Sequence, residues 1–94
     1  MKNVIVSLET IANSVDKELD LSKTQEAIKI TRGLIAGAIS ATADKHDLPL
    51  LKELDKELSI WQSKLEVILS ETAGRKGMAK HARFWAEKLK MSSR

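Results

Sequence analysis

Basic side chains near the C-terminal end of the chain recur at a helical spacing that suits anion binding. Intervals of four, three, four, three and four residues separate Lys76, Lys80, Arg83, Glu87, Lys90 and Arg94. On a helix this spacing aligns five cations and one acid along a single face. Each Lys or Arg that neutralises a phosphate releases counterions, so binding would depend little on sequence and strongly on salt. Together with Arg75, these cations predict a nucleic-acid or anion-binding surface.

The charge of the chain is divided unequally along its length. Residues 75–94 carry seven basic side chains and one acidic one, whereas residues 1–74 carry nine basic and twelve acidic ones. This balance predicts nucleic acid as the first partner, ahead of an acidic protein surface, with membrane phosphates least expected. The alternative is a solvated face without a ligand, because cations near a helix C-terminus are also stabilised by the helix dipole.

Aromatic and aliphatic side chains near the basic face are candidate partner contacts. Phe84 falls beside the cations, where it would stack on an unpaired base at about 1–3 kcal/mol or fill a pocket on a protein. Trp85 falls on the apolar face of the same helix, which is half alanine and suits packing on helices better than insertion into lipid. The alternative function is therefore an interaction or assembly subunit whose last helix docks on an acidic partner through Phe84, Trp85 and Leu89.

No pattern of residues predicts catalysis. The chain has no cysteine and only two histidines, and the loop around His46 offers too few fixed ligands for a metal site. Glu53 and Glu57 are one helical turn apart, but a carboxylate metal site would need further acids from a neighbouring helix. We expect a non-enzymatic protein without a cofactor, a metal or a small-molecule substrate.

The apolar pattern predicts an all-α protein with a single domain over residues 1–94. Three main helices, at about 3–20, 23–44 and 48–73, form an antiparallel bundle, and a basic amphipathic helix follows at about 77–91. The third segment is the most regular, since intervals of three and four residues, a coiled-coil spacing, separate Leu51, Leu54, Leu58, Trp61, Leu65 and Ile68. Residues 1–73 then form an acidic bundle core, and residues 74–94 form the basic helix.

Capping residues, proline and glycine predict where these helices begin and end. Ser22 or Thr24 would cap the second helix, and Asp47 would cap the third, with Pro49 in its first turn. The segment from Gly74 to Gly77 would end the third helix and act as a hinge, because glycine accepts a left-handed backbone. Behind that hinge the last helix would pack on its own bundle, exchange into a second copy or project as an arm.

Two features predict a homodimer. Gly33, Gly37 and Ala41 are spaced by four residues, which would allow another helix to approach closely, first of all a helix of the same chain and alternatively a second copy. Ile60 and Val67 lie away from the seam of the third helix, so they would be exposed, covered by the C-terminal helix or placed in a subunit interface.

Targeting features indicate a cytoplasmic location. The most apolar stretch, residues 33–43, is about half of the ~20 residues that cross a bilayer. The N-terminus reaches Ser7 and Glu9 before an apolar segment of signal-peptide length accumulates. The lack of cysteine suits a reducing compartment.

Overall fold

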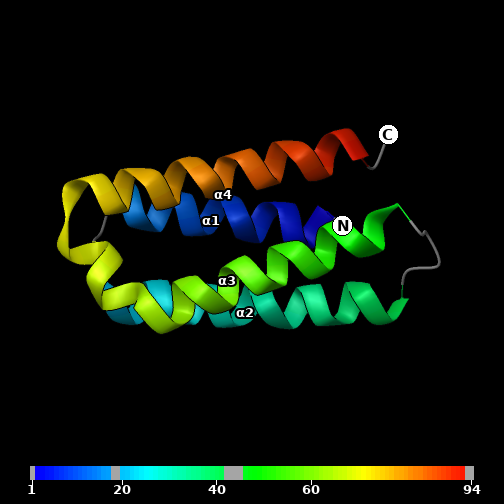
Figure 1. The fold of residues 1–94 in the computed structure, drawn as a ribbon, viewed down its shortest axis with the longest axis horizontal. Coiled ribbons are helices and arrows are strands. Elements are labelled where there is room, and N and C mark those ends of the chain that lie inside the picture. Colours follow the sequence, from blue (N-terminus) through cyan, green and yellow to red (C-terminus); the bar gives the residue numbers. More distant parts are fainter. Residues whose placement is uncertain (1, 18–19, 42–45, 93–94) are drawn as a thin grey trace.

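Four helices make up the computed structural model, which describes residues 2–17, 20–41 and 46–92. They are α1 (Lys2–Lys17), α2 (Leu21–Ala41), α3 (Asp47–Ser70) and α4 (Thr72–Ser92), and the described residues contain no strand (Figure 1). The predicted all-α class is therefore confirmed. The finer prediction of three main helices plus an additional one is not confirmed, because α4 has 21 residues, as many as α2. The predicted end of the second helix at residue 44 lies outside the described residues, and residue 20, the predicted end of the first helix, is not helical.

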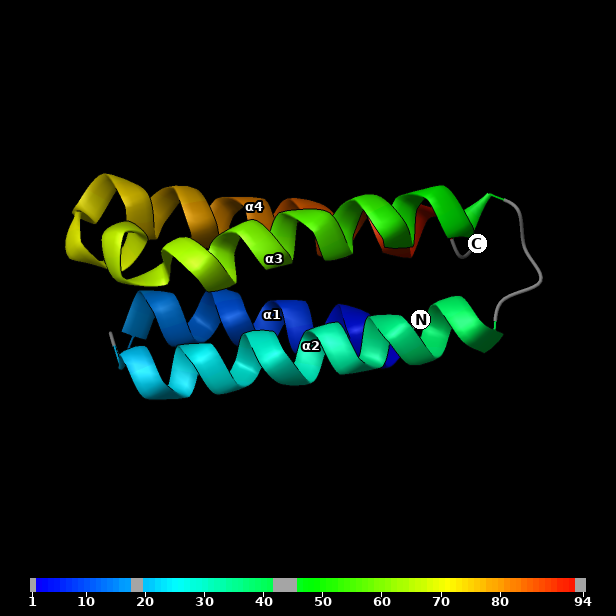
Figure 2. The same cartoon turned by 60° about the horizontal axis from the view of Figure 1, so that its bottom comes forward.

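The helices run alternately in opposite directions, and each lies against two neighbours. α1 contacts α2 and α4, and α3 contacts the same two helices (Figures 1 and 2). The molecule measures 39 × 21 × 17 Å, which matches a cross-section of two helices by two, since a helix with its side chains is about 10 Å wide. The described part of α1 begins and that of α4 ends at the same end of the molecule.

A single apolar core lies between the four helices. The face of α1 that the sequence marks as apolar is buried from Val4 to Val15. The coiled-coil seam of α3 is buried from Leu51 to Leu65, and Ile68 is partly buried against the core.

α4 packs on its own bundle through one face, which answers the question of where this helix lies. Its buried residues are Met78, Ala79, Ala82, Trp85, Ala86 and Leu89. Three of these are alanines, whose short side chains let the α1 and α4 backbones come close, and the contact between α1 and α4 is the most extensive in the molecule. The helix is therefore a structural part of the core.

Two predicted N-caps differ from those in the structure. Asp20 caps α2, because its Oδ1 accepts a hydrogen bond from the Lys23 amide at 3.1 Å, so neither Ser22 nor Thr24 is the cap. α3 begins at Asp47 itself, and the Asp47 carboxylate accepts a hydrogen bond from Ser92 Oγ at 2.6 Å. That contact joins the start of α3 to the end of α4.

The break between α3 and α4 falls at Glu71, and the predicted hinge at Gly74–Gly77 is wrong. Glu71 is extended (φ −120°, ψ 139°), whereas both glycines lie inside α4. Gly74 is required by a close approach, since a methyl group there would overlap the Ile68 carbonyl oxygen. The sharp turn after Ser70 therefore needs a residue without a side chain in the first turn of α4.

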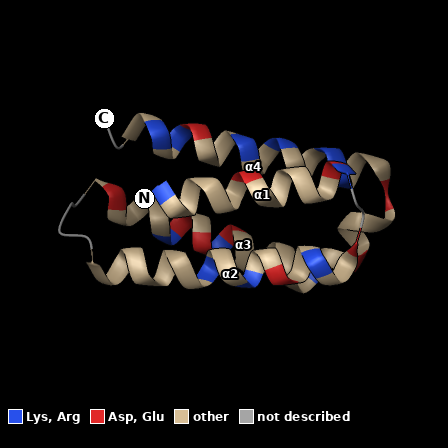
Figure 3. Ribbon diagram, turned by 180° about the vertical axis from the view of Figure 1, so that it is seen from behind, with Lys and Arg blue, Asp and Glu red and all other residues tan. Residues whose placement is uncertain are grey.

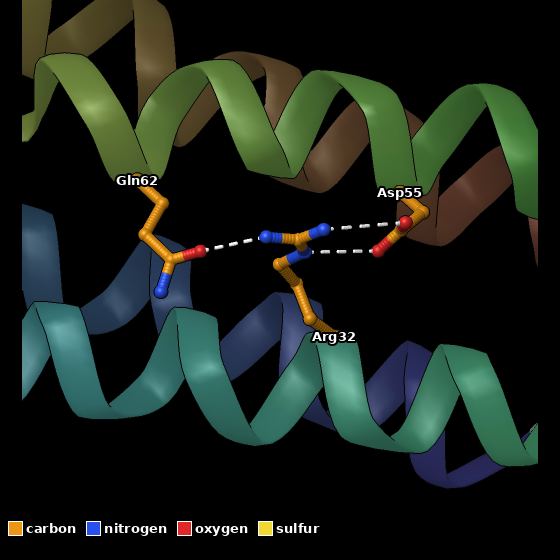
Figure 4. A network of polar contacts seen from close by, with 3 residues as sticks. All are labelled: Arg32, Asp55 and Gln62. Carbon is orange, nitrogen blue, oxygen red and sulfur yellow. Dashed lines mark hydrogen bonds and ion pairs between the residues drawn. The ribbon is translucent and has the colours of Figure 1, made fainter.

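A polar cluster joins α2 to α3 on the outside of the bundle. The Arg32 guanidinium donates to both carboxylate oxygens of Asp55, at 3.0 and 3.5 Å, and to Gln62 Oε1 at 2.8 Å (Figure 4). The hydrogen bond to Asp55 raises the pKa of Arg32, against a smaller lowering by burial. Arg32 stays charged, and its planar fork holds two turns of α3 against α2.

The small residues of α2 are not in contact with another of the described helices. A methyl group added at Gly33 or Gly37 would meet no atom within 4 Å, and Ala41 is also exposed. The expected close packing within the chain is therefore wrong. α4 does not cover Ile60 and Val67 either, because both are exposed.

Gly74 and Gly77 provide a matched test of the turn between α3 and α4. Replacing Gly74 with alanine should lower the free energy of unfolding by about 1–3 kcal/mol, because the new methyl group meets backbone. Replacing Gly77 should raise it by about 0.5–1 kcal/mol, because its space is open and alanine favours the helix. Guanidinium unfolding followed by circular dichroism measures both, and shifts of the same sign would contradict this description of the turn.

Candidate anion-binding face

α4 has a larger excess of basic over acidic side chains than any other helix of the bundle. Between Thr72 and Ser92 there are six basic side chains and one acidic one, and Figure 3 shows the basic positions recurring along the ribbon of α4. Because the opposite side of the helix is buried in the core, these cations are held on a fixed element. We use the term α4 cationic face for Lys76, Lys80, Arg83 and Lys90.

Lys76 and Lys80 differ from the other two cations of this face. Both are exposed, and neither has an ion pair or hydrogen bond to any residue of the described segments. A phosphate that approaches them displaces only water and counterions.

Arg83 and Lys90 lie along the edge where α4 meets α1. Arg83 is paired with Asp16, and Lys90 Nζ is 3.7 Å from Glu9 and 3.5 Å from Glu87. All of these side chains are 39% exposed or more, and such pairs contribute about 0.2–1 kcal/mol each. The acids of α1 therefore lower the positive potential of the α4 cationic face without burying its cations.

Two other predicted cations are placed differently. Arg75 is partly buried, and its guanidinium donates to the Leu69 carbonyl at 2.8 Å and to Thr72 Oγ1 at 3.0 Å. It thus satisfies a carbonyl at the end of α3, so we do not include it in the α4 cationic face. Arg94 lies outside the described residues.

Phe84 and Trp85 are neighbours in sequence with opposite positions. Trp85 is 3% exposed and Phe84 is 57% exposed, with their rings edge to face at 6.2 Å. Sequence reasoning passed over Lys88, whose Nζ lies 5.6 Å from the Phe84 ring centre and 5.0 Å from that of Trp85. The spacing of four between Phe84 and Lys88 was the available signal. The surface therefore presents one aromatic ring covered by one cation.

Glu57 holds Trp85 in place and was not predicted to do so. Its carboxylate accepts a hydrogen bond from the indole Nε1 of Trp85 at 2.6 Å and lies 3.1 Å from His81 Nδ1. The indole N–H is thereby satisfied inside the bundle. Glu57 therefore joins α3 to α4. Within the described segments, no three acidic or histidine side chains are grouped so that they could hold a metal ion.

The remaining predicted contacts divide between core and surface. Ile60 and Val67 stay exposed on α3, whereas Trp85 and Leu89 belong to the core. Of the three residues through which the last helix was expected to dock on an acidic partner, only Phe84 is at the surface.

Comparisons with known proteins do not assign this chain to a family. Neither the protein-family models, the curated proteins nor the solved structures include a match to this chain. Among the described helices, none is both long enough and apolar enough to cross a membrane.

Replacing Trp61 with phenylalanine leaves Trp85 as the sole tryptophan and tests whether α4 is packed. Because Trp85 is buried, its emission should be blue-shifted relative to the unfolded chain and weakly quenched by iodide. A Trp85→Phe variant, which retains Trp61 on α3, is the control. Emission from Trp85 that is unchanged by unfolding and freely quenched would contradict the packing of α4.

Proposed function

We propose that this chain is a small non-enzymatic binding protein that binds nucleic acid through the α4 cationic face. The observation that carries the proposal is the pair of exposed cations Lys76 and Lys80, which have no partner among the described residues and lie on a helix whose opposite side is anchored by Trp85 and Leu89. Binding is to phosphates, so it is largely independent of base sequence.

The dimensions of the face suit a row of phosphates. Lys76 and Lys90 are fourteen residues apart, which is about 21 Å along a helix. A DNA duplex carries one negative charge per about 1.7 Å of its axis, so roughly a dozen phosphates lie along that length. Each of the four cations has several phosphates within reach, and no single register is required.

The ion pairs with α1 are compatible with this proposal. Asp16 and Glu9 hold Arg83 and Lys90 on the edge of the bundle, and pairs as exposed as these exchange readily for phosphate. They also reduce the net charge of the face, which favours affinity in the range of non-specific binding, about 10⁻⁴ to 10⁻⁶ M at physiological salt.

An acidic protein surface is the second candidate partner, and Phe84 is the observation that favours it. An exposed aromatic ring beneath Lys88 is the kind of anchor that fills a pocket on a protein. The two candidates differ in their main contact, since nucleic acid depends on the α4 cationic face and a protein partner depends on Phe84.

A double Lys80→Ala, Arg83→Ala variant tests the proposed function. Fluorescence anisotropy with labelled single- and double-stranded oligonucleotides at about 50 mM salt should show that its affinity is weakened. The slope of log affinity against log salt should become shallower by about two, because two phosphate contacts are lost. A Lys52→Ala, Lys56→Ala variant removes the same charge from exposed positions on α3 and should bind almost as the unmodified chain does.

Removing the charge of Asp16, the acid paired with Arg83, should change the affinity in the opposite direction. An Asp16→Asn variant releases Arg83 from its partner and should bind more tightly. Absence of binding to either oligonucleotide at about 50 mM salt, or equal losses in the α3 and α4 double variants, would contradict the proposal. Co-purification with one acidic protein that depends on Phe84 and is nearly insensitive to salt would favour the second candidate.

A further inference from the structure

An apolar groove lies between α1 and α2, away from the α4 cationic face. Its volume is about 560 Å³, and its walls include Val6 on α1 and Ala27, Ile30 and Leu34 on α2. Val6 and Ile30 are large apolar side chains that are 54% and 52% exposed. The groove is therefore an apolar surface with no partner within the described part of the chain.

The residues between the two helices explain why this groove is open. α1 and α2 meet through short hydroxyl side chains: Ser7 is hydrogen-bonded to Thr31, and Ser14 is hydrogen-bonded to Thr24. Both threonines are fully buried. Short side chains at this contact leave the outer rims of the two helices without a filling residue.

The half of α2 beyond Arg32 has an uncharged surface. Residues 33–41 include no Asp, Glu, Lys or Arg, although 31% of the chain is charged. Gly33, Ala36, Gly37, Ser40 and Ala41 are all exposed there. Depletion of charge is characteristic of the buried centre of a protein interface.

We propose that a second copy of this chain packs on this surface, with its α2 antiparallel to the first around a two-fold axis near residues 33 and 34. This inference is independent of the proposed function. In that register Ile30 of each copy lies over Gly37 of the other, and Leu34 lies over Gly33. Both glycines have open space above them. Large and small residues on one surface are thus self-complementary, as an isologous contact requires.

The charges at the ends of the groove favour the antiparallel orientation. Lys2 lies near one end of the groove and Glu26 near the other. Because Ser7 contacts Thr31, Lys2 is level with residue 36, and Glu26 of the second copy is level with residue 41. The two levels are about 8 Å apart at 1.5 Å per residue, within reach of two extended side chains. Lys23 lies about one helical turn beyond Glu26, further from Lys2. A parallel arrangement would instead place Glu26 of one copy against Glu26 of the other.

The size of the surface predicts a weak dimer. A stable interface buries about 800 Å² on each partner, with 20–30 residues a side, and the groove with the uncharged half of α2 offers fewer. We therefore expect a dissociation constant in the micromolar range. α2 and α4 are not neighbours in the bundle, so both copies would keep the α4 cationic face accessible.

Sedimentation velocity over a concentration series, with matched variants of two exposed apolar residues, tests this interface. An Ile30→Glu variant should keep its helix content and raise the dimer dissociation constant at least about tenfold, because it places two acids near the axis. A Val67→Glu variant makes the same change at a side chain that is 69% exposed on α3 and should dimerise as the unmodified chain does.

Two further variants test the register. Gly37→Leu fills the space opposite Ile30 and should weaken the dimer while leaving the protomer folded. Glu26→Lys should also weaken it, and adding Lys2→Glu should restore it, because the exchanged charges again face one another. A chain that stays monomeric up to about 100 μM, or a dimer that Val67→Glu abolishes and Ile30→Glu does not, would overturn the proposal.

Discussion

The burial of one face of α4 against α1 and α3 is the contact on which the rest of the structure depends. The alanines of that face allow α1 to approach, Trp85 fills the space toward α3, and Glu57 satisfies the indole nitrogen from α3. Without this contact, the apolar sides of α1 and α3 would be left open to water. The free energy of unfolding of a chain of 94 residues is small, so the fold tolerates little such exposure.

The same contact determines how the charges are presented. With α4 anchored, its cations lie on a rigid helix, and two acids of α1 fall beside Arg83 and Lys90. The basic segment is thus a fixed surface with a partly compensated charge. Between α1 and α2, short hydroxyl residues leave an apolar groove. Core packing therefore separates a polar, cationic surface from an apolar one.

The elements that sequence alone located best were those with the strongest periodicity. The seam of α3 is buried as predicted, because spacing fixes which side chains share a helix face. The roles that could not be predicted from the sequence depend on contacts between helices. The role of Gly74 arises from the Ile68 carbonyl, and that of Arg75 from the end of α3. The pairing of Arg83 with Asp16, 67 residues away, has no local signal in the sequence.

Native-state hydrogen exchange tests most directly whether α4 is part of the core. Amides of residues 79–89 in α4 should exchange through the same cooperative opening, and with the same free energy, as those of residues 8–15 in α1, because the two helices bury one another. Amides of α4 that exchange through low-energy local opening while those of α1 remain protected would contradict this account. The cationic segment would then be a detachable arm.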